Sequence, residues 1–187
     1  MDQRAHVELA AKGDQDAFGL LVHGSLARLD AVARLILRDP ELARDAVQEA
    51  LVRAWRDLPG LRDPDRFDAW LHRLTVHACI DLARHRRRRV LEVELTPIDE
   101  PAIGDASAIL ADRDLLDGAL RRLEPEQRAI VVLRYYLDLS LQEMAAVLGI
   151  PIGTVKSRLH RTLAAMRVLV TDDEEPAAAR GAERRTA

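Results

Sequence analysis

The chain has 187 residues and a formal net charge of −3 at pH 7, and 32% of its residues are charged. This length allows one domain or two small ones. A single cysteine, Cys79, excludes an internal disulfide framework and favours a reducing compartment. The N-terminal residues carry scattered charges, so we expect no signal peptide, and no apolar run reaches the length of about 18 residues that a membrane span needs. We therefore expect a cytoplasmic protein.

The small net charge conceals segments of opposite sign. Residues 67–89 carry six arginines against two acidic residues, and residues 140–170 carry one lysine and three arginines against one glutamate. Between them, residues 92–117 carry eight acidic residues against one arginine. Two basic segments that flank an acidic one predict two separate contacts with a polyanion.

The first helices are predicted to begin at aspartates. Asp14 precedes a long stretch of apolar residues at helical spacing, and Asp39 is placed to cap the next helix, in which Pro40 needs no N–H. The apolar stripe of this second helix comprises Ala43, Val47, Ala50, Leu51, Ala54, Trp55 and Leu58. Residues 59–66, PGLRDPDR, break the pattern, and a third helix is predicted over 67–89.

The segment 90–111 contains two prolines, a glycine and many acidic residues, with no helical period, and we interpret it as a flexible acidic linker. Helical patterning resumes in 112–170, and the charged, small residues of 171–187 predict a disordered tail. The predicted fold class is therefore all-α, with two small helical domains at 11–89 and 112–170, of which the C-terminal one is a helix-turn-helix.

The helix-turn-helix is predicted from its boundary residues. Ser140 and Glu143 have the spacing of a capping box, which fixes a helix start. Gly149 tolerates the left-handed backbone that ends this helix, and Pro151 starts the next helix at once. Two helices joined by about three residues that include a glycine form a helix-turn-helix.

The second of these helices has the two faces that a DNA-recognition helix needs. Its apolar face comprises Val155, Leu159, Leu163 and Met166, and its outer face comprises Thr154, Ser157 and Arg161, near Gly153 and His160 and flanked by Lys156 and Arg158. Arginine can read a guanine edge, serine and threonine contact several bases, and flanking cations bind phosphates. The alternative is an ordinary amphipathic helix with a solvated basic face.

Three segments together resemble a known family. LSLQEMAAVLGIPIGTVKSRLHRTLAAMR resembles the C-terminal helix-turn-helix of bacterial extracytoplasmic-function (ECF) sigma factors, the alternative promoter-recognition subunits of RNA polymerase. DAVQEALVRAWRDL, followed by FDAWLHRLTVHACIDLARHRRRR, resembles the N-terminal domain of that family. The resemblance covers about 11–170 and includes the order of helical domain, linker and helical domain.

The resemblance implies partners and sites. Promoter DNA would be bound at the minus-thirty-five element through Thr154, Lys156, Ser157, Arg158 and Arg161, and at the minus-ten element through the loop 58–66 and the following helix, with Arg62, Arg66, Arg73, His77 and Arg84 as candidates. Core RNA polymerase would be contacted through Asp45, Gln48, Glu49 and Arg53. The acidic linker would run toward the polymerase active site. An anti-sigma factor is a further expected partner, and many relatives have Asn where His77 stands.

Individual residues of the helix 67–89 admit two interpretations. Phe67 and Trp70 could stack on unpaired bases, but both lie near the apolar side, so core packing is favoured. Val76 and Ile80 lie opposite the main stripe, so this second face is expected to pack on another helix or on a partner. The cluster RHRRRR at 84–89 is either a phosphate clamp, which we favour, or a solvated helix end.

No pattern in the sequence indicates catalysis or a cofactor. His77 and Asp81 lie one helical turn apart, but two ligands do not make a metal site, and no HExxH or CxxC motif is present. Cys79 is expected to be a small packing residue.

Three functions remain as alternatives. The favoured one is a promoter-specificity subunit that binds core polymerase and is not an enzyme, and that is a monomer with two loosely tethered domains when free. The second is a dimeric helix-turn-helix repressor or activator that needs no polymerase. The third, a helical enzyme acting on nucleic acid, lacks the acid–base or metal cluster that it would need.

Overall fold

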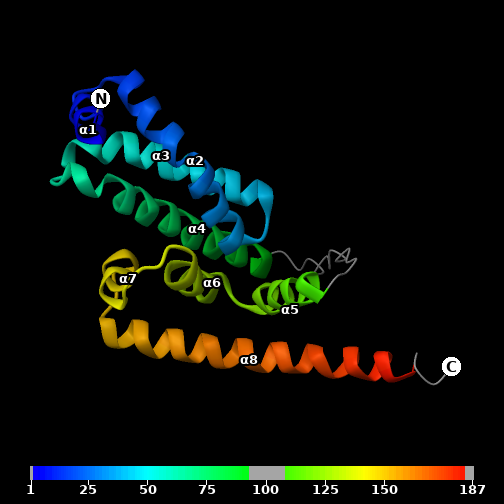
Figure 1. Ribbon diagram of the computed structural model, residues 1–187. Coiled ribbons are helices and arrows are strands. Elements are labelled where there is room, and N and C mark those ends of the chain that lie inside the picture. The colour runs from blue at the N-terminus through cyan, green and yellow to red at the C-terminus, as the bar shows by residue number, and fades with distance from the viewer. Residues whose placement is uncertain (1, 93–107, 184–187) are drawn as a thin grey trace.

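A computed structural model describes residues 2–92 and 108–183, and every regular element within these residues is helical (Figure 1). Within these residues, the N-terminal domain comprises four α-helices and two short 3-10 turns, and the C-terminal domain comprises four α-helices and one π-helical turn. The elements of the N-terminal domain are α1 (Gln3–Ala10), α2 (Gln15–Leu37), α3 (Pro40–Asp57), η1 (Leu58–Gly60), η2 (Pro64–Arg66) and α4 (Phe67–Glu92). Those of the C-terminal domain are α5 (Ala108–Arg122), α6 (Pro125–Val131), η3 (Val132–Tyr136), α7 (Leu141–Leu148) and α8 (Ile152–Glu183).

The predicted aspartate caps are confirmed. The Asp14 carboxylate accepts a hydrogen bond from Ala17 N at 3.0 Å, and Asp39 accepts from Glu41 N at 3.0 Å and from Leu42 N at 3.1 Å. Between α2 and α3 only two residues intervene, and the first, Arg38, takes a left-handed conformation with φ of 60°. This conformation ends α2 and lets α3 fold back at once.

The N-terminal core forms where α3 packs against α2 and α4. Alanines of α3 let the neighbouring helices approach closely, while larger side chains fill the remaining space; Ala43, Ala50, Leu29, Ile36, Leu58, Phe67 and Leu71 are fully buried. Phe18 and Trp55 meet edge to face with ring centroids 5.1 Å apart. The favoured packing role of Phe67 is confirmed, since its side chain is 0% exposed.

Two predicted boundaries differ from the structure. Both ends of the range 90–111, which we expected to be a linker, are helical, because α4 continues to Glu92 and α5 begins at Ala108. The segment 93–107 lies outside the described residues. The expected disordered tail also differs, because α8 continues to Glu183. The alanines at 177–179 are strong helix formers, and their propensity favours a helix despite the high charge of the segment.

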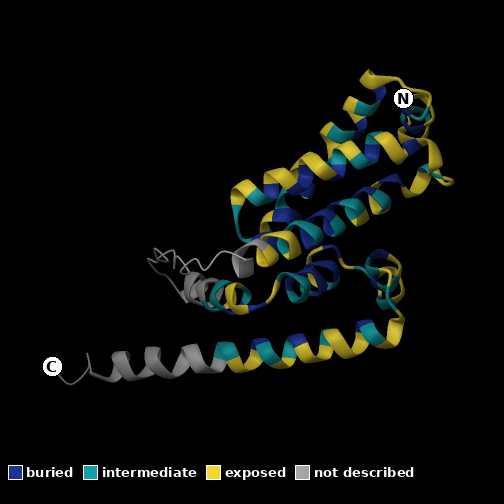
Figure 2. Ribbon diagram, turned by 180° about the vertical axis from the view of Figure 1, so that it is seen from behind, coloured by how far each residue is buried: buried dark blue, intermediate teal, exposed yellow. Residues whose placement is uncertain are grey.

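The two domains pack against each other, so the expectation of loosely tethered domains is wrong for this structure. Helix α4 packs against α6 and α7, and α2 packs against α6 and η3. Figure 1 shows α6 and α7 between α4 and α8, and Figure 2 shows buried residues where these elements meet. The physical reason lies on α4, where Val76 and Ile80 are 0% and 9% exposed. One continuous cluster of buried apolar residues extends from Val7 to Val155.

Candidate nucleic-acid interface

The helix-turn-helix is held by the capping residues that the sequence predicted. Ser140 Oγ accepts from Glu143 N at 3.3 Å, and Glu143 Oε2 accepts from Ser140 N at 2.8 Å. The hydrogen bonds from the Ser140 hydroxyl and then from its backbone N–H lower the pKa of Glu143. Gly149 has a φ of +66°, and its N–H closes α7 on the carbonyl of Ala145 at 2.9 Å. Glycine suits this left-handed position because it has no Cβ.

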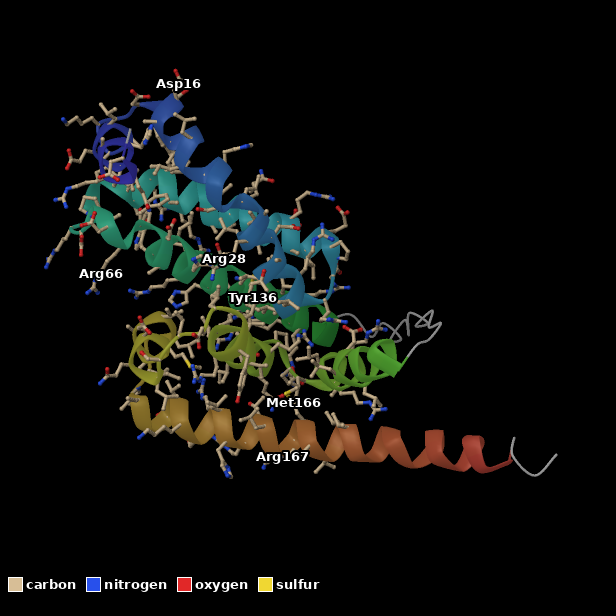
Figure 3. All side chains as sticks on the ribbon, in the orientation of Figure 1. Asp16, Arg28, Arg66, Tyr136, Met166 and Arg167 are labelled. Carbon is tan, nitrogen blue, oxygen red and sulfur yellow. The ribbon has the colours of Figure 1, made fainter. Side chains whose placement is uncertain are left out.

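The two faces of α8 are those that the sequence predicted, except that Thr154 of the outer face is half-buried. Val155 and Met166 are buried, Leu159 and Leu163 are half-buried, and Lys156, Ser157, Arg158 and Arg161 are exposed. In Figure 3, Met166 lies between α8 and the rest of its domain, whereas Arg167 lies on the outer side. Ser157 Oγ donates to the carbonyl of Thr154 at 3.0 Å, and Arg161 Nε donates to that of Ser157 at 3.3 Å. These bonds orient the Ser157 and Arg161 side chains on the exposed side of α8.

The candidates for minus-ten contact do not form one open surface in this conformation. Arg66 and Arg73 line a cleft of about 660 Å³ whose opposite wall is made by Leu137, Leu139 and Val147 of the C-terminal domain. His77 Nε2 is 2.6 Å from the carbonyl oxygen of Val147, and Arg84 Nε is 3.0 Å from Glu126 Oε1. Arg62 is exposed on the loop before α4. Trp70 is half-buried in the same cleft, so it serves packing on one side only.

His72 is a residue of this cleft that no sequence pattern indicated. Its Nδ1 lies 2.7 Å from the carbonyl oxygen of Asp68, and its Nε2 is buried with no hydrogen-bond partner among the described residues. Burial is the main cause that lowers the pKa of His72, the Arg28 charge adds to it, and the bond to Asp68 opposes it. The imidazole is therefore held neutral in the cleft at neutral pH.

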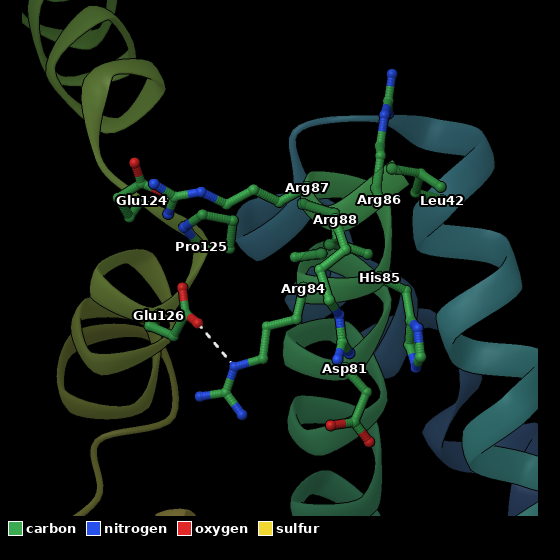
Figure 4. A pocket seen from close by; sticks show the side chains of 12 residues that line it. Leu42, Asp81, Arg84, His85, Arg86, Arg87, Arg88, Glu124, Pro125 and Glu126 are labelled. Carbon is green, nitrogen blue, oxygen red and sulfur yellow. Dashed lines mark hydrogen bonds and ion pairs between the residues drawn. The ribbon is translucent and has the colours of Figure 1, made fainter. Parts of the chain in front are cut away.

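The basic cluster at the end of α4 contacts acidic side chains in this conformation. Arg86 Nη1 lies 2.6 Å from Asp39 Oδ2, and Arg87 Nη1 lies 3.2 Å from Glu124 Oε2. Together with Arg84 and Arg88, these arginines line a cavity of about 950 Å³ between the end of α4 and the start of α6 (Figure 4). The proposed phosphate clamp remains a prediction.

The candidate polymerase contacts lie on one face of α3. Asp45, Gln48 and Glu49 are exposed, whereas Arg53 is half-buried and bonds both Glu49, at 2.8 Å, and Asp81 of α4, at 3.2 Å. The bond to Glu49 is the main cause that raises the pKa of Arg53. Arg53 therefore has a structural role between α3 and α4.

Metal binding has no geometric support in the described part of the chain, where no three His, Cys, Asp or Glu residues gather. Asp81 bonds Arg53, and His77 bonds the backbone of α7. Cys79 is fully buried, and burial raises the pKa of its thiol to about 12, so its expected role in packing is confirmed. None of the described helices has the length and apolarity to cross a membrane.

Arg128 of α6 is a second residue that no sequence pattern indicated. Its side chain is only 6% exposed, and all of its described hydrogen bonds go to carbonyl oxygens. Nε donates to Ile36 of α2, and Nη1 donates to Leu123 at 2.6 Å and to Leu120 at 3.3 Å. Burial is the main cause that lowers the pKa of Arg128 to about 10, so the group stays charged at neutral pH.

The fold and the site define a two-domain helical protein whose second domain is a helix-turn-helix with a basic outer face. Comparison with known proteins agrees with this class in both domains. Residues 21–89 match the family model for sigma-70 region 2, and residues 113–166 match that for sigma-70 region 4.

Curated relatives extend the match across both domains. The RNA polymerase sigma-E factor of Streptomyces avermitilis is 39% identical over 135 residues, which cover 72% of this chain and 74% of that protein. The ECF RNA polymerase sigma factor SigM of Mycobacterium tuberculosis is 35% identical over 172 residues, covering 90% of this chain and 86% of that one. The chain therefore belongs to the ECF sigma factors, and it acts as a sigma subunit in the initiation of transcription.

Solved structures show the same fold. The sigma factor RpoE, in complex with the anti-sigma factor NepR from Bartonella quintana, has a TM-score of 0.67 at 27% identity. The match covers 82% of this chain and 96% of the RpoE chain. CnrH, in complex with the cytosolic domain of CnrY, has a TM-score of 0.62 at 32% identity. The match covers 92% of this chain and 99% of the CnrH chain.

Proposed function

We propose that this sigma factor divides its work among three surfaces: α3 for core RNA polymerase, α4 with its preceding loop for the minus-ten element, and α8 for the minus-thirty-five element. The observation that carries the proposal is the helix-turn-helix, in which a capped α7 and the left-handed Gly149 set α8 with its basic side outward. The chain supplies binding energy and positioning and no covalent chemistry of its own.

Some residues of α8 suit contacts with the DNA backbone, and others suit contacts with the bases. Lys156 and Arg158 flank the outer face, and both are exposed, which suits phosphate contacts. Arg161 and Ser157 stand on the middle of that face, which suits contacts with base edges in a major groove.

On α3 the exposed Asp45, Gln48 and Glu49 form a polar acidic face that suits a basic partner surface. This is the face that we assign to core polymerase. Complexes of related sigma factors with anti-sigma factors support an anti-sigma partner for this chain as well. A protein that works on core RNA polymerase would act in the cytoplasm.

Binding to core polymerase and run-off transcription from a genomic promoter pool test the function directly. We expect the purified chain to bind core polymerase and to direct initiation from a defined subset of promoters. Asp45→Arg should weaken core binding, whereas Asp16→Arg, the same charge change at an exposed position of α2, should not. A chain that binds duplex DNA but ignores polymerase would overturn the proposal and support the dimeric repressor.

The assignment of α8 is tested with a promoter in which each base pair of the minus-thirty-five element is changed in turn. Arg161→Ala should lose about 1–3 kcal/mol of discrimination at one or two base pairs. Lys156→Ala should weaken binding to all sequences alike and reduce the salt dependence. Equal weakening by Arg161→Ala on every sequence would remove Arg161 from the base-reading set.

A further inference from the structure

Helix α1 lies beside the loop that leads from α3 into α4, although the two are far apart in the sequence (Figure 1 and Figure 2). It packs against α2 and against η2, the 3-10 turn at the end of the loop 58–66. We propose that α1 is a positioning element for the minus-ten contact, in which Arg4, through Asp65 of η2, holds this loop in the place from which it binds unpaired promoter DNA. The inference rests on the proposed role of α4 and its preceding loop. It concerns a helix that lies outside the region 2 match at 21–89.

Helix α1 is attached to the domain by its apolar side and by the turn that follows it. A helix of eight residues is marginal on its own, so its structure depends on packing. Val7 and Ala10 are buried and belong to the apolar cluster of the core. Gly13, with a φ of 98°, takes the left-handed conformation in the turn between α1 and α2. These two attachments let α1 support a neighbouring loop.

Arg4 is the side chain that connects α1 to the loop. Its Nη1 lies 3.1 Å from Asp65 Oδ2, and its Nε lies 3.4 Å from Glu8 Oε1, one turn further along α1. Glu8 thus orients the guanidinium that Asp65 receives. The side chains of Arg4 and Asp65 are 53% and 67% exposed, so this ion pair selects a position for the loop more than it stabilises the fold.

The other contacts of the loop shape it without fixing the outer turn. Leu58 is buried and Leu61 is half-buried against the core, which holds the first half of the loop. In the second half, the Asp63 carboxylate accepts a hydrogen bond from Asp65 N at 3.2 Å and lies 3.3 Å from Arg66 Nε. These contacts are internal to the turn. η2 packs against α4, which continues directly from it, and against α1, which is therefore a support independent of the continuing chain.

The pairing also decides which charge the loop offers to DNA. The loop carries two arginines and two aspartates, so it has no formal net charge of its own. Asp63 is paired with Arg66, and Asp65 with Arg4, which leaves Arg62 as the cation of the loop without an ion-pair partner among the described residues. Release of the Asp65 carboxylate would add an unpaired negative charge to this surface and repel phosphates. Arg4 therefore keeps Arg62 as the group that the loop presents to DNA.

Binding of a single-stranded minus-ten oligonucleotide to the complex of the chain with core polymerase tests the proposal. The oligonucleotide takes its sequence from a promoter selected in the run-off pool, and a duplex with only the minus-thirty-five element is the reference ligand. Arg4→Gln should weaken binding of the oligonucleotide about threefold and leave binding of the duplex and of core polymerase unchanged. Arg34→Gln is the matched control, because Arg34 forms an exposed ion pair with Asp30 at 2.6 Å within α2, and it should change none of the three.

A double-mutant cycle separates positioning through Asp65 from a direct contact of Arg4 with DNA. If Arg4 acts through Asp65, the loss caused by Arg4→Gln should fall below about 1.5-fold in a chain that already carries Asp65→Asn. Val7→Ala loosens α1 without changing any charge, so it should also weaken binding of the oligonucleotide. Val32→Ala removes the same methyl groups from a fully buried position in α2 and should not weaken it.

Unchanged binding of the oligonucleotide by the Arg4→Gln complex would overturn the proposal. A loss that persists in full in the Asp65→Asn chain would also overturn it, because Arg4 would then contact DNA directly. Weaker binding of core polymerase would instead assign α1 to that partner, and equal losses in Val7→Ala and Val32→Ala would assign the effect to stability; both results reject the positioning role. Failure of the proposed function is distinguishable, because the wild-type chain itself would then fail to bind core polymerase or the oligonucleotide.

Discussion

Replacing Asp39 should separate the contribution of a helix cap from that of a charge. Asp39 accepts two N–H groups at the start of α3 and forms an ion pair with Arg86 at the end of α4. Loss of the cap costs about 1 kcal/mol. The ion pair adds about 0.5 kcal/mol at most, because the side chains of Arg86 and Asp39 are 58% and 30% exposed. Asp39→Ala should therefore cost about 1.5 kcal/mol, or roughly 3–6 °C in Tm for a chain of this size.

Asp39→Asn keeps a capping oxygen and removes the charge, so it should cost about 0.5 kcal/mol or less. Urea unfolding followed by tryptophan fluorescence measures both variants, because the two tryptophans, Trp55 and Trp70, lie in the N-terminal domain. Equal losses in both variants would show that the charge, and not the cap, determines the stability at this position.

The pH dependence of the stability difference between wild type and Asp39→Asn is an independent test of the contribution of the charge. Burial would raise the pKa of Asp39, but the N–H of Leu42, the Arg86 guanidinium and the N–H of Glu41 together lower it below its ordinary value. A carboxyl whose folded pKa is depressed adds stability above its unfolded pKa and loses it as pH falls through the folded value. The advantage of wild type over Asp39→Asn should be present at pH 6 and should shrink below about pH 4.

Three further substitutions test the fold. Gly149→Ala should destabilise the C-terminal domain by about 1 kcal/mol, measured by tyrosine fluorescence, because φ is +66° and the added Cβ meets no atom within 4 Å. Phe67→Ala should cost about 3–5 kcal/mol in urea unfolding, because the ring is fully buried. Burial lowers the pKa of His72 in the folded state. The wild type should therefore lose stability as pH falls below the unfolded His72 pKa of about 6.5. In a series of melting curves at different pH, His72→Phe should not show this loss.

Local signals in the sequence predicted the parts of the fold that depend on neighbouring residues. Asp14, Asp39 and Ser140 cap their helices because a side-chain oxygen needs only an N–H two or three residues away. The outer face of α8 follows from helical periodicity in the same way. The second apolar face of α4, with Val76 and Ile80, also predicted a packing partner, but the partner itself could not be named from the sequence.

The hydrogen bonds between the domains had no such signal. The acceptors at Ile36 and Val147 are main-chain carbonyls, which every residue carries, and Arg128 follows Pro125 and Glu126 as an arginine on any solvated helix would. The same holds for His77, whose family position indicates DNA and whose bond here is to protein. Long-range pairing to a backbone atom leaves no compositional pattern, so it was found only in the structure.

Substitutions affect the donors and the acceptors of the two hydrogen bonds between the domains differently, because both acceptors are main-chain carbonyl oxygens. A substitution at Ile36 or Val147 keeps the main-chain carbonyl. The hydrogen-bond acceptor is therefore retained as long as the ends of α2 and α7 keep their helical conformation. The donor side has no such protection, because one codon change at Arg128 or His77 removes the donor altogether. Substitutions at Arg128 or His77 should therefore weaken the contact between the domains, whereas conservative apolar substitutions at the buried Ile36 and Val147 should leave the two hydrogen bonds in place.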